Sequence, residues 1–243
     1  MIRLNRFMAQ SGVAARRKCD ELISQGKVKV NGQIITELGT VIDEMKDSVE
    51  YNGKELNKVS KFTYIVLNKP REVISSVEDK HRRQTVVELV AAPQRIFPVG
   101  RLDYETTGVL LLTDDGELTN LLLHPRYKAV KIYHVLLDKR IKPIDMHNFK
   151  NGIELEGTKT QPCKIRELRV VDNCSFLEVE LKEGRKRQIR LMFAALGYSV
   201  EELDRVSFAG INYQGLKPGQ WRYLTDDEVE QLKKSVQKVN LNG

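Results

Sequence analysis

Near the middle of this chain a polar loop, residues 100–108, opens directly into the apolar run 109–112. A short apolar run bounded by turn residues predicts a buried strand in the interior of a sheet. The loop holds Asp103 beside Arg101 and between two glycines. Such an aspartate either satisfies backbone N–H groups of the turn or is a catalytic carboxylate that the strand holds in place. The local sequence leaves both interpretations open.

Composition indicates a globular protein of one large or two small domains, with 243 residues, 41% of them hydrophobic and 30% charged. No apolar run approaches the roughly 20 residues of a membrane span, and the first residues lack the apolar core of a signal peptide. We therefore expect a cytoplasmic protein with no membrane partner. Because no coiled-coil repeat is present, we also expect a monomer.

The cysteines and histidines give no sign of a metal or a disulfide framework. Cys19, Cys163 and Cys174 form an odd set without CxxC spacing, and the four histidines are scattered. Metal sites and disulfide frameworks need closely spaced or paired ligands. We therefore expect a reducing compartment and no bound metal.

Positive charge gathers in two parts of the chain, although the net charge is only +7. Residues 1–35 carry seven basic side chains and two acidic ones, and a second basic cluster spans residues 182–190. A charge run is often just a solvated surface. Two dense basic clusters, each embedded in periodic apolar sequence, instead favour a nucleic-acid partner.

The first 57 residues predict a small separate module. Its apolar residues recur at helical spacing in two short stretches, ended by Gly12 and Gly26. Alternation over residues 27–30 and again after the turn Asn31-Gly32 predicts a β-hairpin. We expect a polar linker at residues 58–61.

A larger domain is predicted for residues 62–238, followed by a tail at 239–243. Strand patterns cover residues 62–69, 109–112, 130–137, 164–171, 176–181 and 203–208. Helical patterns cover residues 118–122, 146–149, 189–196 and 226–236, the last with Thr225 as its N-cap. Since strands outnumber helices, the fold class is α+β, with a mixed, mostly antiparallel sheet flanked by helices.

Two further residues stand out besides Asp103. Tyr133 lies in an alternating strand, where it either packs against the sheet or offers a ring on which a nucleobase stacks. On a helical wheel, Arg190 lies about 100° from Ile189, at the edge of the buried face. From that edge its guanidinium could reach an interior carboxylate.

The N-terminal module resembles the alpha-L motif, an RNA-binding domain first described in a small-subunit ribosomal protein. The resemblance rests on residues 11–18 (SGVAARRK) and 26–32 (GKVKVNG). Such modules often carry Ser where this chain has Ala15, so the hydroxyl that would cap the second helix is missing.

The whole chain resembles the RsuA-type family of RNA pseudouridine synthases, which carry an alpha-L domain before a catalytic domain. The matching segments are residues 100–108 (GRLDYETTG), 113–116 (TDDG), 124–127 (HPRY), 131–133 (KIY) and 183–190 (EGRKRQIR). Residues 124–127 and 216–222 look most like the RluB branch, which modifies 23S rRNA. In the family's first motif a glycine is usual where this chain has Glu72, which would be strained in a turn with positive φ.

The resemblance implies conversion of uridine to pseudouridine in ribosomal RNA, and its RluB-like segments point to 23S rRNA. The substrate would be either free rRNA or rRNA within a partly assembled subunit. The reaction involves no net redox change, so neither cofactor nor metal is implied. Asp103 would be the catalytic carboxylate, Arg190 would keep it ionised, and Tyr133 would stack on the flipped base with Ile189 behind it. The residues expected to contact RNA are Arg3, Arg6, Arg16, Arg17, Lys18, Lys27, Lys29, Lys69, Arg101, Arg185, Lys186 and Arg187.

Three alternatives stay open at this stage. The same reaction on 16S rRNA is the nearest one. A non-catalytic RNA-binding or ribosome-assembly factor would explain the basic clusters, but it would need none of Asp103, Tyr133 and Arg190. A glycoside hydrolase needs two paired carboxylates, and Glu105 is the nearest neighbour of Asp103 in the sequence.

Overall fold

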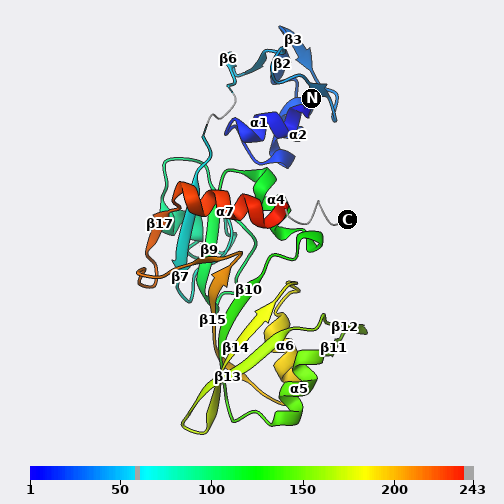
Figure 1. Ribbon diagram of the computed structural model, residues 1–243. Coiled ribbons are helices and arrows are strands. Elements are labelled where there is room, and N and C mark those ends of the chain that lie inside the picture. The colour runs from blue at the N-terminus through cyan, green and yellow to red at the C-terminus, as the bar shows by residue number, and fades with distance from the viewer. Residues whose placement is uncertain (58–60, 238–243) are drawn as a thin grey trace. The chain divides into compact units, whose positions relative to one another are not determined.

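A computed structural model describes residues 1–57 and 61–237, which form two compact units (Figure 1). The first contains residues 1–62, and the second contains most of the chain that follows. Of the predicted linker only Lys61 is described. The predicted tail at 239–243 lies outside the described residues, as does residue 238.

The first unit packs two helices, α1 (Leu4–Gln10) and α2 (Arg16–Ser24), against short strands. The predicted hairpin is present as β2 (Val28–Val30) and β3 (Gln33–Ile35). Its turn residues Asn31 and Gly32 have φ of 51° and 78°, as a type I′ turn requires. The N-cap of α2 is Ala15, and no side chain caps that end.

Four further strands in this unit were not predicted. β1 (Ile2–Arg3) pairs with β4 (Val41–Ile42), while β5 (Val49–Tyr51) and β6 (Lys54–Glu55) extend the hairpin sheet to the order β3-β2-β5-β6. Each has only two or three residues, which is too short for an alternating pattern to be recognised.

The second unit contains one long mixed sheet, which has nine strands within the described residues. Its main order is β13-β14-β10-β15-β9-β7-β17. Only β9 and β15 pair in parallel among the described neighbours, so the predicted α+β fold with a mostly antiparallel sheet is confirmed. The strands are β7 (Tyr64–Lys69), β8 (Phe97–Pro98), β9 (Thr107–Thr113), β10 (Lys131–Leu137), β13 (Lys164–Val171), β14 (Cys174–Leu181), β15 (Val200–Phe208), β16 (Ile211–Asn212) and β17 (Trp221–Tyr223).

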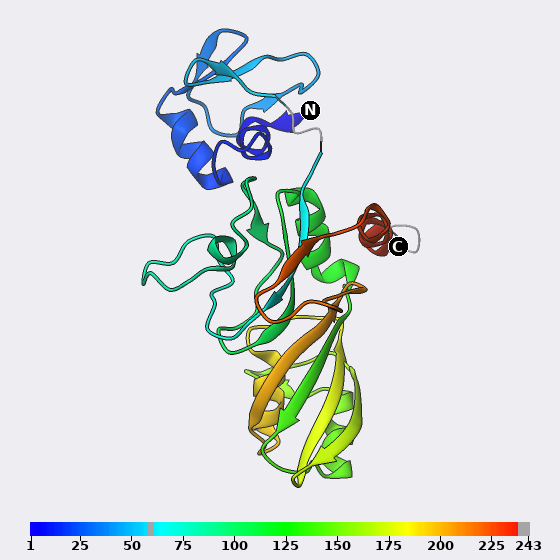
Figure 2. The same cartoon turned by 90° about the vertical axis from the view of Figure 1, so that its left-hand side faces the viewer.

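Helices cover the two parts of this sheet differently. Around the strands β7 and β9, α3 (Val86–Val90) packs on one face, while α4 (Gly116–Leu123) and α7 (Asp226–Gln237) pack on the other (Figure 2). α5 (Pro143–Asn151) and α6 (Gln188–Ala195) cover β10, β14 and β15. A 3-10 turn at Pro125–Tyr127 and the two-stranded β11 (Glu154–Leu155) and β12 (Thr158–Lys159) complete the unit.

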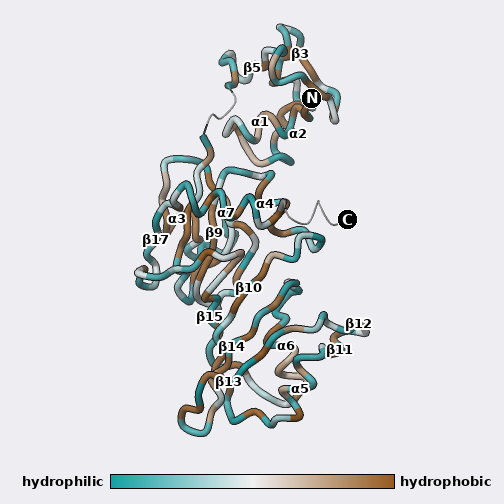
Figure 3. The backbone as a smooth tube through the Cα atoms, viewed as in Figure 1, coloured by the Kyte–Doolittle hydropathy of each residue, from teal (hydrophilic) through white to brown (hydrophobic). Residues whose placement is uncertain are grey.

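The predicted buried strand is β9, which is apolar along most of its length (Figure 3) and buried after its first residue. Where it meets β15, Gly108 has a φ of 102°, and a Cβ there would lie 2.3 Å from the carbonyl oxygen of Arg205. No other residue type fits this position without displacing backbone. The close approach brings the loop that precedes β9 against β15.

Glu72 adopts the left-handed conformation that its place in the first motif suggested, with a φ of 62°. Its backbone N–H donates to the carbonyl oxygen of Tyr104 at 2.9 Å. The turn thus connects to the Asp103 loop, at the cost of a backbone conformation that favours glycine.

Candidate active site

A pocket of about 700 Å³ lies within the second unit. One wall is the Asp103 loop, residues 99–106, and another is the segment 183–189 that leads into α6. The floor is a sheet face made by β10 and β15. A cavity of this size holds a nucleotide-sized ligand.

The Asp103 loop is tied to the segment that follows β7. The hydroxyl of Ser75 accepts from the backbone N–H of Leu102 at 3.1 Å and donates to its carbonyl oxygen at 2.9 Å. Behind the loop, the ammonium of Lys69 donates to the carbonyl oxygens of Tyr104 and Thr106. These bonds hold the loop backbone from behind, so the position of Asp103 is fixed before any ligand binds.

The carboxylate of Asp103 makes no hydrogen bond or ion pair with any other described residue, although its side chain is half-buried in the pocket wall. The turn's own bond runs from the backbone N–H of Thr106 to the backbone oxygen of Asp103, not to its carboxylate. The side chain is therefore not needed to satisfy the turn. Of the two interpretations of this loop, the geometry favours the one in which the carboxylate acts on a ligand.

Lys69 differs from its expected role as an RNA contact. It is fully buried, and its Nζ donates to three carbonyl oxygens, the third being that of Pro70 at 2.9 Å. Burial lowers the pKa of Lys69 to about 8, against the opposing effect of the Glu105 and Asp103 carboxylates. The side chain cannot reach a phosphate from there, and it supports the Asp103 loop instead.

Tyr133 and Ile189 both line the same pocket as Asp103. Tyr133 projects from β10 and is half-buried, while Ile189 lies in the first turn of α6 and is almost fully buried. The structure thus brings the predicted carboxylate, aromatic ring and packing residue together around one cavity.

Arg190 is near Asp103 but does not bond to it. Its Nη1 donates to the carbonyl oxygen of Val200 at 2.7 Å, and its buried Nε has no partner. Burial and the neighbouring Arg187 lower the pKa of Arg190, whereas the charges of Asp103 and Glu105 raise it. The expected direct hydrogen bond is absent, and only a through-space interaction joins the two groups.

The other basic residues predicted to bind RNA are placed in three ways. Arg101, Lys186 and Arg187 are exposed and line the pocket. Arg185 also lines it, but its guanidinium donates to the carbonyl oxygens of Thr158 and Lys159. In the first unit, the exposed side chains are those of Arg3, Arg16, Arg17, Lys18, Lys27 and Lys29, while Arg6 is half-buried.

Two pocket residues, Lys131 on β10 and Arg205 on β15, were not predicted. Arg205 is only 3% exposed; its Nε donates to the carbonyl oxygen of Val109, and its buried Nη2 has no partner. Lys131 donates to the carbonyl oxygen of Ala129. The only sign of them in the sequence was a basic residue within each predicted strand. The alternation of apolar and polar residues does not show whether such a residue faces the pocket or the solvent.

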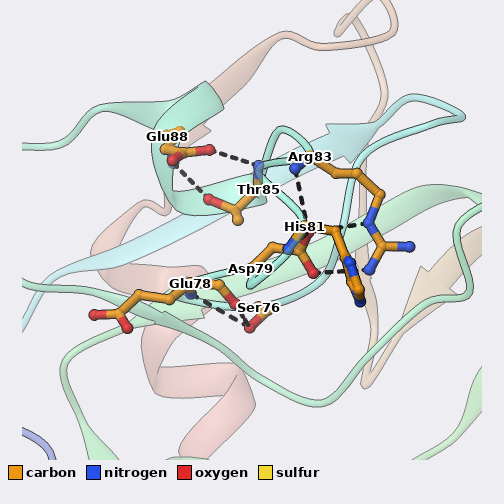
Figure 4. Close-up of polar contacts among 7 residues, drawn as sticks. All are labelled: Ser76, Glu78, Asp79, His81, Arg83, Thr85 and Glu88. Atoms are coloured by element: carbon orange, nitrogen blue, oxygen red, sulfur yellow. Dashed lines mark hydrogen bonds and ion pairs between the residues drawn. The ribbon is translucent and has the colours of Figure 1, made fainter.

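The loop before α3 was also missed. Asp79, which lines the pocket, accepts from the backbone N–H groups of His81 and Arg83 and from the Arg83 guanidinium (Figure 4). Thr85 and Glu88 close the loop with a reciprocal capping box at the start of α3 (Figure 4). This ordered loop carries an exposed basic run whose sequence was a visible signal: Lys80, His81, Arg82 and Arg83.

The remaining carboxylates of the pocket are already engaged. Asp79 is bound by Arg83, and Glu183 accepts from the backbone N–H of Gln161 and from the side chain of Gln188. Glu105, the nearest candidate for a paired glycosidase carboxylate, does not line the cavity. Among the residues that the structure describes, no group of three or more His, Cys, Asp or Glu side chains is arranged to hold a metal ion.

Taken together, an unpartnered carboxylate, a half-buried aromatic ring and a rim of exposed cations define a site suited to chemistry on a nucleotide within a polyanion. Comparison with known proteins agrees with this class. The sequence profile of the RNA pseudouridylate synthase family matches residues 63–195, and that of the S4 domain matches residues 2–48. The chain belongs to the RNA pseudouridylate synthase family, and its first unit is an S4 domain.

Relatives match almost the full length of the chain. "Ribosomal large subunit pseudouridine synthase B" of Bacillus subtilis (strain 168) is 44% identical, covering 96% of each chain. "Dual-specificity RNA pseudouridine synthase RluF" of Escherichia coli (strain K12) is 34% identical, covering 97% of this chain and 80% of the relative. A crystal structure of a pseudouridylate synthase aligns over 96% of this chain and all of its own, with a TM-score of 0.69 and 30% identity. The prediction of an RNA pseudouridine synthase is thus confirmed, and a non-catalytic RNA-binding factor is excluded.

Proposed function

We propose that this enzyme isomerises a specific uridine of ribosomal RNA to pseudouridine and that Asp103 is its catalytic carboxylate. One observation carries the assignment. Among the described residues that line the pocket, Asp103 is the one whose carboxylate is bound by no other protein group. Lys69 and Ser75 anchor its loop from behind.

The reaction breaks the N1–C1′ bond of the nucleoside and joins C5 of the base to C1′. It needs one ionised carboxylate near the sugar, and no net oxidation or reduction takes place. The side chain of Asp103 is half-exposed, and its charge acts on the guanidinium of Arg190 through space, where it raises the pKa of Arg190. Arg190 is therefore an electrostatic partner of the carboxylate rather than its hydrogen-bond donor.

The target base must leave its stack to reach Asp103. Flipping costs a few kcal/mol, and stacking on an aromatic ring returns about 1–3 kcal/mol. Tyr133, which lines the pocket, would receive the base, and Ile189, another lining residue, would pack behind it. Arg101, exposed at the rim, would hold the displaced backbone.

Large-subunit 23S rRNA is the proposed substrate, because the Bacillus relative named for that subunit is 44% identical over nearly the whole chain. The S4 domain would anchor the RNA through its exposed basic side chains. We further propose that the enzyme acts as a monomer in the cytoplasm, where ribosomal RNA is made. None of the described helices is long and apolar enough to cross a membrane.

The experiment is a map of pseudouridines in 23S and 16S rRNA from a deletion strain complemented with either wild type or Asp103→Asn. We expect one or a few 23S positions to lose the modification in the deletion strain and to regain it only with wild type. In vitro, Asp103→Asn should lower single-turnover activity by at least about a thousandfold. Its RNA affinity should stay within severalfold of wild type.

Glu105→Gln is the matched control, since it removes a neighbouring carboxylate that does not line the pocket. It should retain most activity. Near-normal turnover by Asp103→Asn would contradict the assignment of Asp103 as the catalytic carboxylate. If wild type restores pseudouridine only at a position of 16S rRNA, the substrate is 16S rRNA and not 23S rRNA.

A further inference from the structure

The pocket floor holds two cations, the buried Arg205 and the half-buried Lys131, that have no part in the roles of Asp103, Tyr133 and Arg190. Lys131 and Arg205 both line the cavity, and neither forms an ion pair with a described carboxylate. Burying a cation without a counter-ion costs free energy. Such cations therefore suggest a functional site at which a ligand supplies the missing negative charge.

The sheet register places both cations beside Tyr133. Arg205 is the direct cross-strand neighbour of Tyr133, and Lys131 lies two residues before Tyr133 on the same face of β10. The ladder between β10 and β15 shifts register between Ile132 and Tyr133. Such a bulge re-aims side chains, and here Arg205 and Phe208 both face the pocket.

The two cations share one aromatic neighbour. The Arg205 guanidinium lies 4.8 Å from the centre of the Phe208 ring, and the Lys131 ammonium lies 5.6 Å from it. Phe208 thus keeps two positive charges near each other on the apolar floor, where their repulsion favours binding of an anion between them.

Each cation has donors to spare. Arg205 uses Nε on the carbonyl oxygen of Val109 and leaves Nη2 unpartnered. Lys131 uses one of its three ammonium protons on the carbonyl oxygen of Ala129 at 2.8 Å. Acceptor oxygens of a ligand are the partners still missing.

The reaction itself generates such an anion. When the N1–C1′ bond breaks, the electron pair leaves with the base, whose negative charge spreads over N1, O2 and O4. The pair then forms the C5–C1′ bond, C5 gives up its proton, and N1 takes one up. Between these steps the detached uracil must remain in the pocket and bear its charge.

We propose that Lys131 and Arg205 form the anion-stabilising floor of the pocket, where their cations hold the uracil oxygens while the detached base is negatively charged. This inference rests on the proposed function. A flat base stacked on Tyr133 would lie directly beside both residues, whereas a hydrated backbone phosphate would not reach the guanidinium of Arg205, a residue only 3% exposed. The base, rather than the RNA backbone, is the source of the anion.

The test compares Lys131→Met and Arg205→Met with wild type in single-turnover assays on the mapped rRNA substrate, at saturating enzyme. Removing one donor to a developing anion lowers the rate by about 10²-fold, so we expect that loss in each variant with RNA Kd within about threefold. Arg169→Met and Lys139→Met are matched controls, because each removes an exposed cation that lies over an aromatic ring away from the pocket. Both should keep the wild-type rate.

A pH profile separates charge from mere packing. Burial lowers the pKa of Lys131 to about 8, the charge of Arg205 adds to this lowering, and Glu183 opposes it. The wild-type rate should therefore fall as the pH rises through this range and the ammonium loses its proton. In Lys131→Arg the cation stays protonated, so the fall should move to higher pH. Lys69 titrates in the same range but is unchanged in this variant.

Several outcomes overturn the assignment. A tenfold weaker Kd with an unchanged saturated rate would assign the cations to a backbone phosphate. If the rate of Lys131→Arg falls over the same alkaline pH range as that of wild type, Lys131 has only a packing role. This measurement tests the proposal even if Arg205→Met fails to fold. Loss of the proposed function would be seen separately, as a wild-type enzyme that forms no pseudouridine in rRNA.

Discussion

At the scale of single residues, the second unit concentrates its buried charge around one loop. Lys69 supports the Asp103 loop from behind, while Lys131 and Arg205 line the same pocket as Asp103. Lys69 and Arg205 are buried and Lys131 is half-buried, and burial lowers the pKa of both lysines to about 8. Such shifts link the stability of the fold to pH.

We predict that the free energy of unfolding rises between about pH 8 and about pH 9.5 and that Lys69→Met removes part of this rise. In that window the folded protein holds Lys69 neutral, because its pKa is about 8, whereas the unfolded chain, with a pKa of 10.5, stays protonated. Raising the pH therefore disfavours unfolding, by up to about 1.4 kcal/mol per pH unit for this group. Urea titrations across the window measure the slope.

Lys182→Met, which removes an exposed lysine of the same unit, is the control and should keep the wild-type slope. If Lys69→Met also keeps it, the Lys69 ammonium is not desolvated in solution.

At the scale of elements, the helix ends differ in how they are capped. α3 begins with a complete capping box, and the hydroxyl of Thr225 accepts from the backbone N–H of Glu228 at the start of α7. The N-cap of α2 is Ala15, whose extended backbone suits that position but whose side chain offers no acceptor. α1 likewise has no side-chain hydrogen bond at its N-cap, Arg3, so neither helix of the S4 domain is capped by a side chain at its start.

We predict that Ala15→Thr stabilises α2 by about 1 kcal/mol relative to Ala15→Val, a substitution of the same shape without a hydroxyl. The gain comes from an acceptor for an N–H of the first turn. Hydrogen exchange on the full chain should show about fivefold more protection of the α2 amides in Ala15→Thr. Equal protection in the two variants would mean that water already caps this end as well.

At the scale of the whole molecule, basic groups belong to both units. The S4 domain displays six exposed cations among those predicted to bind RNA, and the pocket rim adds Arg101, Lys186 and Arg187. Affinity for a polyanion sums over the phosphates that such groups neutralise, and it falls with salt.

We predict that replacing Arg16, Arg17, Lys27 and Lys29 with glutamine makes the log–log salt dependence of rRNA binding shallower, by about 0.7–0.9 for each phosphate that the variant no longer neutralises. The saturated rate should be unchanged, since these residues lie outside the catalytic unit. Lys46→Gln with Lys54→Gln, which removes two other exposed lysines of the first unit, is the control. An unchanged slope in the quadruple variant would mean that the S4 domain does not hold RNA through these side chains.

Much of the catalytic unit could be predicted because its strands carry strong patterns. The apolar run of β9, the alternation of β10 and the spacing of α6 are all present as expected, and they carry Asp103, Tyr133 and Ile189 to one pocket. The short strands β8 and β17 were missed because two or three residues show no period.

The misses at the site have a common physical reason. Lys69 ends an apolar strand and looks like a surface cation in the sequence, yet its ammonium is buried against three carbonyl oxygens. Arg205 depends on a bulge that no periodicity reveals. Arg190 was placed correctly at the edge of its helix face, but its guanidinium donates to the nearer oxygen of Val200. Burial and partner choice are tertiary properties, which local sequence does not encode.

The parallel pairing of β9 with β15 has a consequence for when the enzyme becomes active. Gly108 and Arg205 meet across a stretch of about 100 residues of chain, and contacts between such distant residues form late because closing a long loop is entropically costly. During synthesis, the Asp103 loop leaves the ribosome well before β15 exists. A nascent chain therefore carries its carboxylate without a pocket, and it acquires activity only after β15 has been made and has paired with β9.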